Sequence, residues 1–180
     1  FTSTNWSLNV SLSSTQPFNL NTITTNPIAV YDTAVTSIIA ASGMKANFMI
    51  LPRDGFVAVK NHQSITDRIK YTSRELTPAM LGGLFDIPEV LVANGAYDSS
   101  ELGRTSTMAN YFSDNSFVGY KPASAGPKQP SSGYIFRKDS PLVRRWRDED
   151  REAECIEVQM KFVPKVVASL SGYLIKDIIQ

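Results

Sequence analysis

Near the end of the chain, apolar and polar side chains alternate, and this pattern constrains the fold more than any other feature of the sequence. The apolar positions are Ile156, Val158, Met160 and Phe162, and the polar positions between them are Glu157, Gln159 and Lys161. A repeat of two residues is typical of a β-strand with one wet face. The sequence therefore predicts a long strand over residues 154–163.

Two helices are predicted by their end signals. Asn26 before Pro27 is a typical helix start, a stripe of apolar residues follows at helical spacing, and Gly43 can end the helix, which predicts a helix over 28–42. Thr77 before Pro78 predicts a second helix that ends near residue 84. Shorter helices are expected at 56–61 and 64–71.

The other segments predict a mixed order of elements. Short apolar runs indicate strands at 46–51, 90–93 and 117–120, and residues 166–175 are strand-like but interrupted by Gly172. Residues 1–26 are rich in Ser, Thr and Asn and are expected to form an extended lead-in. Surface loops are expected between residues 94 and 116 and over 121–133. Because helices and strands do not alternate regularly, the fold class predicted is α+β.

Composition excludes several classes of protein. The 180 residues can form one domain or two packed lobes, and 18 basic against 17 acidic residues leave a charge of +1, which does not favour a dedicated nucleic-acid reader. Cys155 is the only cysteine, so no internal disulfide can form and a reducing compartment is expected. No apolar run approaches the roughly 20 residues that span a membrane. The chain starts at Phe1 without a signal peptide, and we expect it to be a segment of a longer product.

The sequence shows no catalytic or metal-binding signature. His62 is the only histidine, so a zinc site built from His and Cys is excluded within one chain, although a carboxylate-only metal site stays open. Ser64 and Asp67 near His62 do not form a known triad, and a surface or capping role is the simpler interpretation. Nucleotide-binding motifs are also missing. We predict no enzyme activity, no cofactor and no metal.

The densest group of charges predicts a contact surface. It consists of Arg144, Arg145, Trp146, Arg147, Asp148, Glu149, Asp150, Arg151 and Glu152. Arg and Trp are favoured anchors of protein interfaces, and Arg pairs well with carboxylates. A solvated charged stretch is the alternative. Catalysis by Asp148 and Glu149 is disfavoured, because the neighbouring arginines keep both groups ionised.

Several stretches together resemble the major capsid proteins of tailed bacteriophages and prophages, the Hong Kong 97-like family. The resemblance covers about 85% of the chain, from about residue 26 to the end, and lies in residues 42–51, 59–62, 65–72, 84–92, 144–152, 154–162 and 172–175. It implies a shell subunit with a peripheral domain and an axial domain. The first would contain residues 27–44 and 136–165, with helix 28–42 as the spine beside strand 154–163. The second would contain residues 45–135 and 166–180.

The resemblance also implies partners. It implies homo-oligomers, in pentamers and hexamers, scaffold or decoration proteins as further partners, and DNA enclosed without sequence-specific binding. The subunit would reside in the virion capsid, and in the host bacterial cytoplasm during assembly. An encapsulin-type or gene-transfer-particle shell is the alternative within this fold. Rivals from other classes are a small carboxylate-dependent hydrolase and a soluble binding module with its site in the loops at 94–116 or 121–133.

Overall fold

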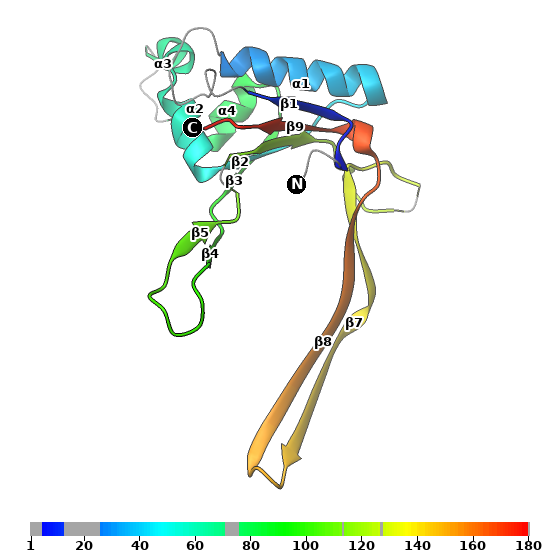
Figure 1. Cartoon of the computed structure of the whole chain (residues 1–180). Coiled ribbons are helices and arrows are strands. Elements are labelled where there is room, and N and C mark those ends of the chain that lie inside the picture. Colours follow the sequence, from blue (N-terminus) through cyan, green and yellow to red (C-terminus); the bar gives the residue numbers. More distant parts are fainter. Residues whose placement is uncertain (1–4, 13–25, 71–75, 113, 127, 180) are drawn as a thin grey trace. The chain divides into compact units, whose positions relative to one another are not determined.

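The computed structural model describes residues 5–12, 26–70, 76–112, 114–126 and 128–179. The chain divides into two compact units (Figure 1). The first unit contains residues 1–132 and 168–180, and the second contains residues 133–167.

The first unit is built on a five-stranded mixed sheet. Its strands are β1 (Leu8–Ser11), β9 (Gly172–Lys176), β6 (Ser116–Gly119), β2 (Phe48–Pro52) and β3 (Glu89–Ala93), in that spatial order. The two outer pairs, β1 with β9 and β2 with β3, are parallel, whereas β6 is antiparallel to both of its neighbours. A small separate hairpin, β4 (Ala96–Asp98) with β5 (Met108–Asn110), extends from the same unit.

Helices gather on one face of this sheet (Figure 1). They are α1 (Pro27–Ser42), α2 (Arg53–Asn61), α3 (Gln63–Ile69) and α4 (Pro78–Leu84), and a 3-10 turn, η3 (Ser169–Ser171), precedes β9. The buried face of α1 contains Tyr31, Ala34 and Ile38, each fully buried in the core beneath the helix. The core therefore lies between the helices and the sheet.

The local end signals of α1 and α4 are confirmed. The Asn26 side chain accepts a hydrogen bond from the backbone N–H of Ile28 at 3.1 Å, and Gly43 ends α1 with a φ of 69°. Thr77 caps α4 by accepting a hydrogen bond from the backbone N–H of Met80. These contacts satisfy backbone groups that each helix end leaves without an intrahelical partner.

Part of the predicted extended lead-in over residues 1–26 forms a regular strand, which the sequence analysis did not expect. Leu8–Ser11 forms the edge strand β1, and Leu8 and Val10 pack against the core. Trp6 is buried on the other face of the sheet, where its ring lies 4.5 Å from that of Phe117. The alternation of Leu8 and Val10 with polar residues is short, and the many Ser and Thr residues around it are typical of loops, so the sequence did not predict this strand. Residues 13–25 lie outside the described residues.

The predicted loop over residues 94–116 contains the small β4–β5 hairpin, and the predicted loop over 121–133 ends at Ser132, because the next strand begins at Gly133. The predicted strand 154–163 is confirmed within a longer strand, β8 (Ala153–Val166). Its partner β7 (Gly133–Asp148) was not expected from the sequence.

The structure groups α1 with the sheet of the first unit and β8 with the second unit. The division into peripheral and axial domains stays a prediction.

Candidate interaction surface

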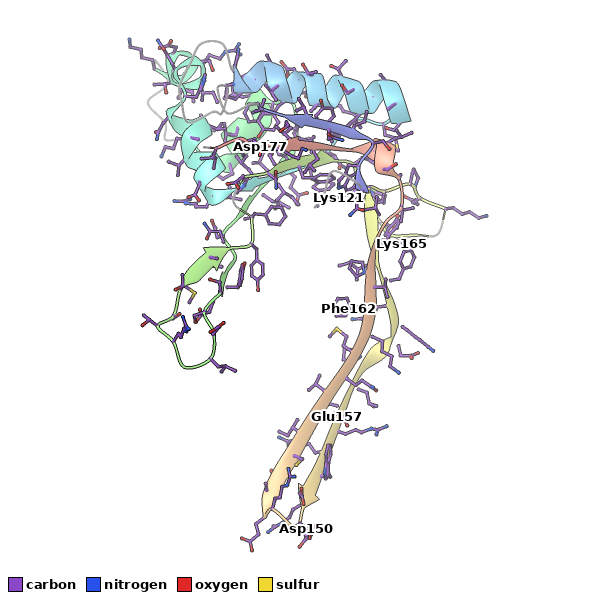
Figure 2. The ribbon with its side chains drawn as sticks, in the orientation of Figure 1. Lys121, Asp150, Glu157, Phe162, Lys165 and Asp177 are labelled. Carbon is purple, nitrogen blue, oxygen red and sulfur yellow. The ribbon has the colours of Figure 1, made fainter. Side chains whose placement is uncertain are left out.

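Residues 133–167 form a long two-stranded antiparallel ribbon (Figure 2). Its strands β7 and β8 have 16 and 14 residues, and a four-residue turn over 149–152 connects them. Glu152, the last residue of this turn, has a φ of 47°. In the following we call residues 144–157 the tip of the ribbon and the remaining residues its base.

An irregularity interrupts β7 but leaves the faces of the ribbon aligned. Lys138 is opposite Lys161, and the next paired position, Leu142, is opposite Gln159. The extra residues of β7 include Asp139, which has a φ of 63°, and Pro141, which has no N–H to donate. Because β7 gains an even number of residues here, side chains before and after the bulge keep the same alternation between the two faces.

Alternation and register together define one apolar face of the ribbon. Residues directly opposite each other in an antiparallel pair share a face, and successive residues of one strand point to opposite faces. Pairing of Val143 with Val158 and of Arg145 with Ile156 therefore places one set of side chains together. We call the apolar members of this set the apolar ribbon face: Ile135, Val143, Ile156, Val158, Met160 and Phe162. Arg137, Arg145, Arg147 and Glu154 lie on the same side of the ribbon.

The opposite face of the ribbon is mixed in character. It carries the like-charged pair Lys138–Lys161 and the oppositely charged pair Arg144–Glu157. Trp146 lies on this face, opposite Cys155, and is 49% exposed. The thiol of Cys155 thus belongs to a ribbon surface and not to the core.

The structure brings the predicted interface residues 144–152 together at the tip, but it does not form a single patch from them. Arg144, Trp146 and Asp148 lie on the mixed face, whereas Arg145 and Arg147 lie on the same side as the apolar ribbon face. The ion pairs here are long, at 3.9 Å for both Arg147–Glu149 and Arg151–Asp148. Exposed pairs of this kind contribute about 0 to 1 kcal/mol each, so they leave the arginines available to other partners.

His62 has a structural position in the first unit. It is 1% exposed and precedes α3, where its Nδ1 accepts a hydrogen bond from the backbone N–H of Ser64 and lies 2.7 Å from the Ser64 hydroxyl. This contact agrees with the capping role that the sequence indicated, but a surface position was wrong because the ring is buried. In the described residues, no three His, Cys, Asp or Glu side chains cluster closely enough to hold a metal ion.

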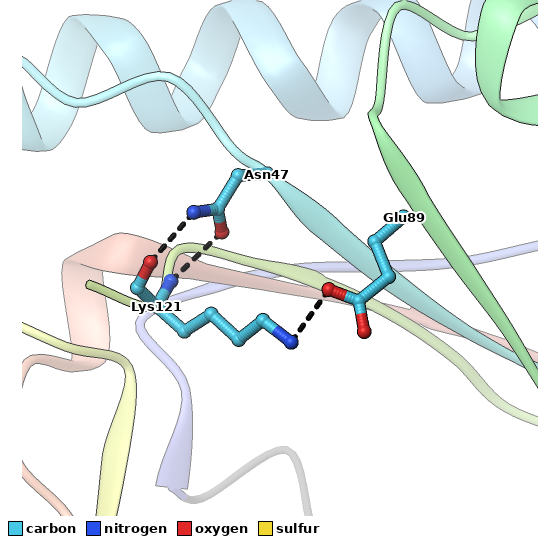
Figure 3. A network of polar contacts seen from close by, with 3 residues as sticks. All are labelled: Asn47, Glu89 and Lys121. Atoms are coloured by element: carbon cyan, nitrogen blue, oxygen red, sulfur yellow. Dashed lines mark hydrogen bonds and ion pairs between the residues drawn. The ribbon is translucent and has the colours of Figure 1, made fainter. Parts of the chain in front are cut away.

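A polar cluster of Asn47, Glu89 and Lys121 connects the ends of three strands in the first unit (Figure 3). The Asn47 side chain bonds to both backbone groups of Lys121, with Nδ2 donating to the carbonyl at 2.6 Å and Oδ1 accepting from the N–H at 2.9 Å. The Lys121 ammonium lies 2.5 Å from a Glu89 carboxylate oxygen and 5.6 Å from the centre of the Phe48 ring. These contacts fasten the chain leaving β6 to β2 and β3, which is a structural function.

Asp98 organises the loop between β4 and β5. Its Oδ1 accepts hydrogen bonds from the Ser100 N–H, the Ser100 hydroxyl and the Thr107 N–H, and its Oδ2 accepts one from the Ser106 hydroxyl. The Ser106 hydroxyl, followed by the two Ser100 donors, holds the pKa of this carboxyl well below its usual range. An ionised carboxylate with all its partners inside its own loop is not arranged for acid or base catalysis.

Comparison with known proteins adds two similarities. No protein-family model matches the chain. Among curated proteins, the chain is 25% identical over 159 residues to the major capsid protein of Burkholderia phage BcepMu, which covers 85% of this chain and 50% of that protein. Among solved structures, it matches a phage-related protein from Bordetella bronchiseptica RB50 with a TM-score of 0.87 and 24% identity.

The chain shares its fold with that phage-related protein. The match covers 99% of this chain and 59% of the solved chain, so it includes both units described above. The chain spans about half the length of the curated relative that it resembles. In the described residues, no helix is long and apolar enough to cross a membrane.

Sequence analysis found the tip of this surface but missed its larger part. The strand β7 was overlooked because Asp139, Ser140 and Pro141 are typical of loops. The alternation from Ile156 to Phe162 was recognised, and it was the signal that could have revealed the apolar ribbon face. It could not show that these side chains are exposed.

Proposed function

We propose that this chain is part of a structural subunit of a phage or prophage head, of the Hong Kong 97-like family. The observation that carries the proposal is the similarity to a phage major capsid protein along 85% of the chain. The exposed ribbon of residues 133–167 agrees with it, because a shell subunit needs surfaces that it buries only against other subunits.

The finer parts of the proposal follow from the same family. The subunit contains a peripheral and an axial domain, and it assembles with other copies into pentamers and hexamers, with scaffold or decoration proteins as further partners. The assembled shell encloses DNA without reading its sequence. The subunit resides in the virion capsid, after assembly in the host bacterial cytoplasm.

The proposal includes a structural role without catalysis. Its support is the arrangement of the titratable groups: His62 caps a helix, Asp98 is bonded within its own loop, and Glu89 is paired with Lys121. A carboxylate-dependent hydrolase, the rival considered above, would instead need two carboxylates of different pKa converging on a pocket.

Electron microscopy of the natural gene product that contains these 180 residues tests the function. Expressed alone or with its neighbouring genes, it should form closed shells or rings of subunits of uniform size. A product that stays monomeric under all of these conditions would contradict the shell function and favour a binding module. Particles that package a specific protein cargo in place of DNA would favour the encapsulin-type alternative.

A further inference from the structure

Two buried hydroxyl groups lie where the chain of the first unit leads into the ribbon and resumes after it. Ser132 is the last residue before β7, and Ser171 is the last residue of η3, three residues after Ala168. The two serines are 3% and 0% exposed. Polar groups buried to this extent are retained where hydrogen bonds hold them, so their partners indicate their role.

The Ser132 hydroxyl connects three segments of the first unit. It accepts a hydrogen bond from the N–H of Tyr120, which follows β6, at 3.0 Å. Its oxygen lies 2.9 Å from the Tyr120 carbonyl and 2.8 Å from the Ser171 carbonyl, so its single proton is shared between these two acceptors. The Ser132 N–H donates to the Tyr120 carbonyl at 3.0 Å. Ser132 is therefore held by both its backbone and its side chain.

Ser171 extends this network to the other end of the ribbon. Its hydroxyl lies 2.8 Å from the Ala168 carbonyl and 3.3 Å from the Ser132 hydroxyl oxygen, and it can donate to either. Ala168 directly follows the last residue of the ribbon. A continuous path of polar contacts thus joins the residue before the ribbon to the residue after it. We call Ser132 and Ser171, with these contacts, the serine clamp.

The serine clamp holds two chain ends next to the first pair of the ribbon ladder. That pair is Gly133 with Val166. A Cβ atom at Gly133 would lie 3.2 Å from the Lys165 carbonyl oxygen, so the two strands approach each other closely there. Because side chains alternate between the faces with a period of two residues, the first pair determines which face every later residue takes.

The middle and the tip of the ribbon fix the register only weakly. The turn over 149–152 contains neither the Gly nor the Asn that favours a tight hairpin, and Glu152 has a left-handed φ of 47°. The bulge in β7 interrupts the ladder. On the mixed face, Lys138 is directly opposite Lys161, and like charges in that position are unfavourable.

We propose that the serine clamp sets the register of β7 with β8, so that the ribbon is paired from its base toward its tip. The clamp thereby determines which side chains share the apolar ribbon face, although it does not touch them. Ser132 and Ser171 are positioning residues in this sense. The inference goes beyond the proposed function, because it concerns the subunit before it contacts any partner.

Hydrogen exchange measured by mass spectrometry tests the clamp in the natural gene product, on subunits that have been separated from particles. Ser132→Ala removes the hydroxyl that the Tyr120 and Ser171 carbonyls share, so peptides of the ribbon should exchange about three to ten times faster, whereas peptides of α1 should be unchanged. Unchanged exchange in the ribbon would overturn the proposal. Equal acceleration in the ribbon and in α1 would also overturn it, because it would show a general loss of stability.

Ser116→Ala is the matched control for this variant. Ser116 is also fully buried, and its hydroxyl donates to the Ile50 carbonyl at 3.1 Å and lies 3.0 Å from the Tyr31 hydroxyl. Its partners are therefore in β2 and α1. Its removal should not accelerate exchange in the ribbon selectively, and a selective effect there would contradict the assignment to the clamp.

A change at the tip tests the direction of pairing and leaves the clamp intact, so it decides the question even if Ser132→Ala does not fold. Proline cannot adopt a φ of 47°, and Glu152→Pro therefore breaks the turn. Peptides around Gly133 and Val166 should keep their slow exchange, and only peptides near the turn should exchange faster. Fast exchange along the whole ribbon would show that the turn sets the register, which would overturn the proposal and leave the shell function standing.

Discussion

At the scale of single residues, Gly172 is the described glycine with the least space for a side chain. A Cβ atom there would come closer than 3.0 Å to the rings of both Trp6 and Phe117, which meet over this glycine. We expect Gly172→Ala to lower the free energy of unfolding by about 1 to 3 kcal/mol, the usual cost of overpacking a tight core. Denaturation in urea, followed by circular dichroism, measures this change.

Gly83 provides the matched control for that experiment. It lies in α4, it is exposed, and a Cβ there would meet no atom within 4 Å. Gly83→Ala should raise the free energy of unfolding by about 0.5 to 1 kcal/mol, since alanine favours a helix more than glycine does. Equal effects of the two substitutions would contradict the packing described around Trp6.

Asp98 makes the β4–β5 loop sensitive to acid. Because its folded pKa is below the unfolded value, the carboxylate stabilises the loop above about pH 4, and this contribution is lost as the pH falls toward the folded pKa. We expect the amide signals of Ser100 and Thr107 in NMR spectra to shift and to exchange faster as the pH is lowered from about 4. Asp98→Asn removes this titration, so the acid-dependent change in the Ser100 and Thr107 signals should be much smaller in that variant.

At the scale of elements, the sequence was informative where the signal is local. The ends of α1 and α4 were predicted because Asn26, Gly43 and Thr77 act within one turn of their own helix. The strand β1 was missed because its partner β9 lies more than 160 residues further along the chain, and β7 was missed because its middle contains residues that are typical of loops. A segment rich in Ser and Thr, or one containing Asp139 and Pro141, becomes a strand only when another strand provides its hydrogen bonds.

For the candidate surface, the sequence predicted which residues take part but not how they are divided between the two faces of the ribbon. The charged residues 144–152 were singled out from composition alone, and the structure places all of them at one end of a ribbon. Their division between two faces depends on the register of β7 with β8, which composition does not contain.

Excision of the ribbon should leave the first unit folded. Its five strands and its core lie outside residues 133–167, and the backbones that enter and leave the ribbon are close together, since Gly133 is paired with Val166. Replacing residues 133–167 by a short Gly-Ser linker should therefore preserve cooperative thermal unfolding in circular dichroism. The same deletion in the natural gene product should abolish assembly, as measured by light scattering. Loss of cooperative unfolding would show that the two units depend on each other for stability.

At the scale of the whole molecule, the arginines of the tip are expected to influence assembly without determining the fold. Reversing Arg144, Arg145 and Arg147 to Glu in the natural gene product should reduce the yield of particles several-fold, because each weak contact is repeated at every subunit of a shell. The fold should persist, since substitutions at exposed positions usually change stability by about 0.5 kcal/mol or less each. Size-exclusion chromatography with light scattering measures assembly, and circular dichroism measures folding.

The control for this variant is a reversal of the same total charge elsewhere. Lys60, Arg68 and Lys70 are exposed positions in or beside α2 and α3 of the first unit. If reversing these residues reduced the particle yield as strongly as the tip variant does, net charge would explain the effect, and the tip would be an ordinary solvated surface.

The pairing of β1 with β9 determines when the sheet of the first unit can form completely. β9 is an interior strand between β1 and β6, and it is formed by residues 172–176, whereas β1 is formed by residues 8–11. While a ribosome is still adding residues 133–167, the first unit has neither β9 nor a place for β1. At that stage the strands β2, β3 and β6 form a sheet whose β6 edge is open, and an open edge is prone to pair with other chains. A ribosome that pauses within the ribbon would therefore prolong the time during which the β6 edge is open to pairing with other chains.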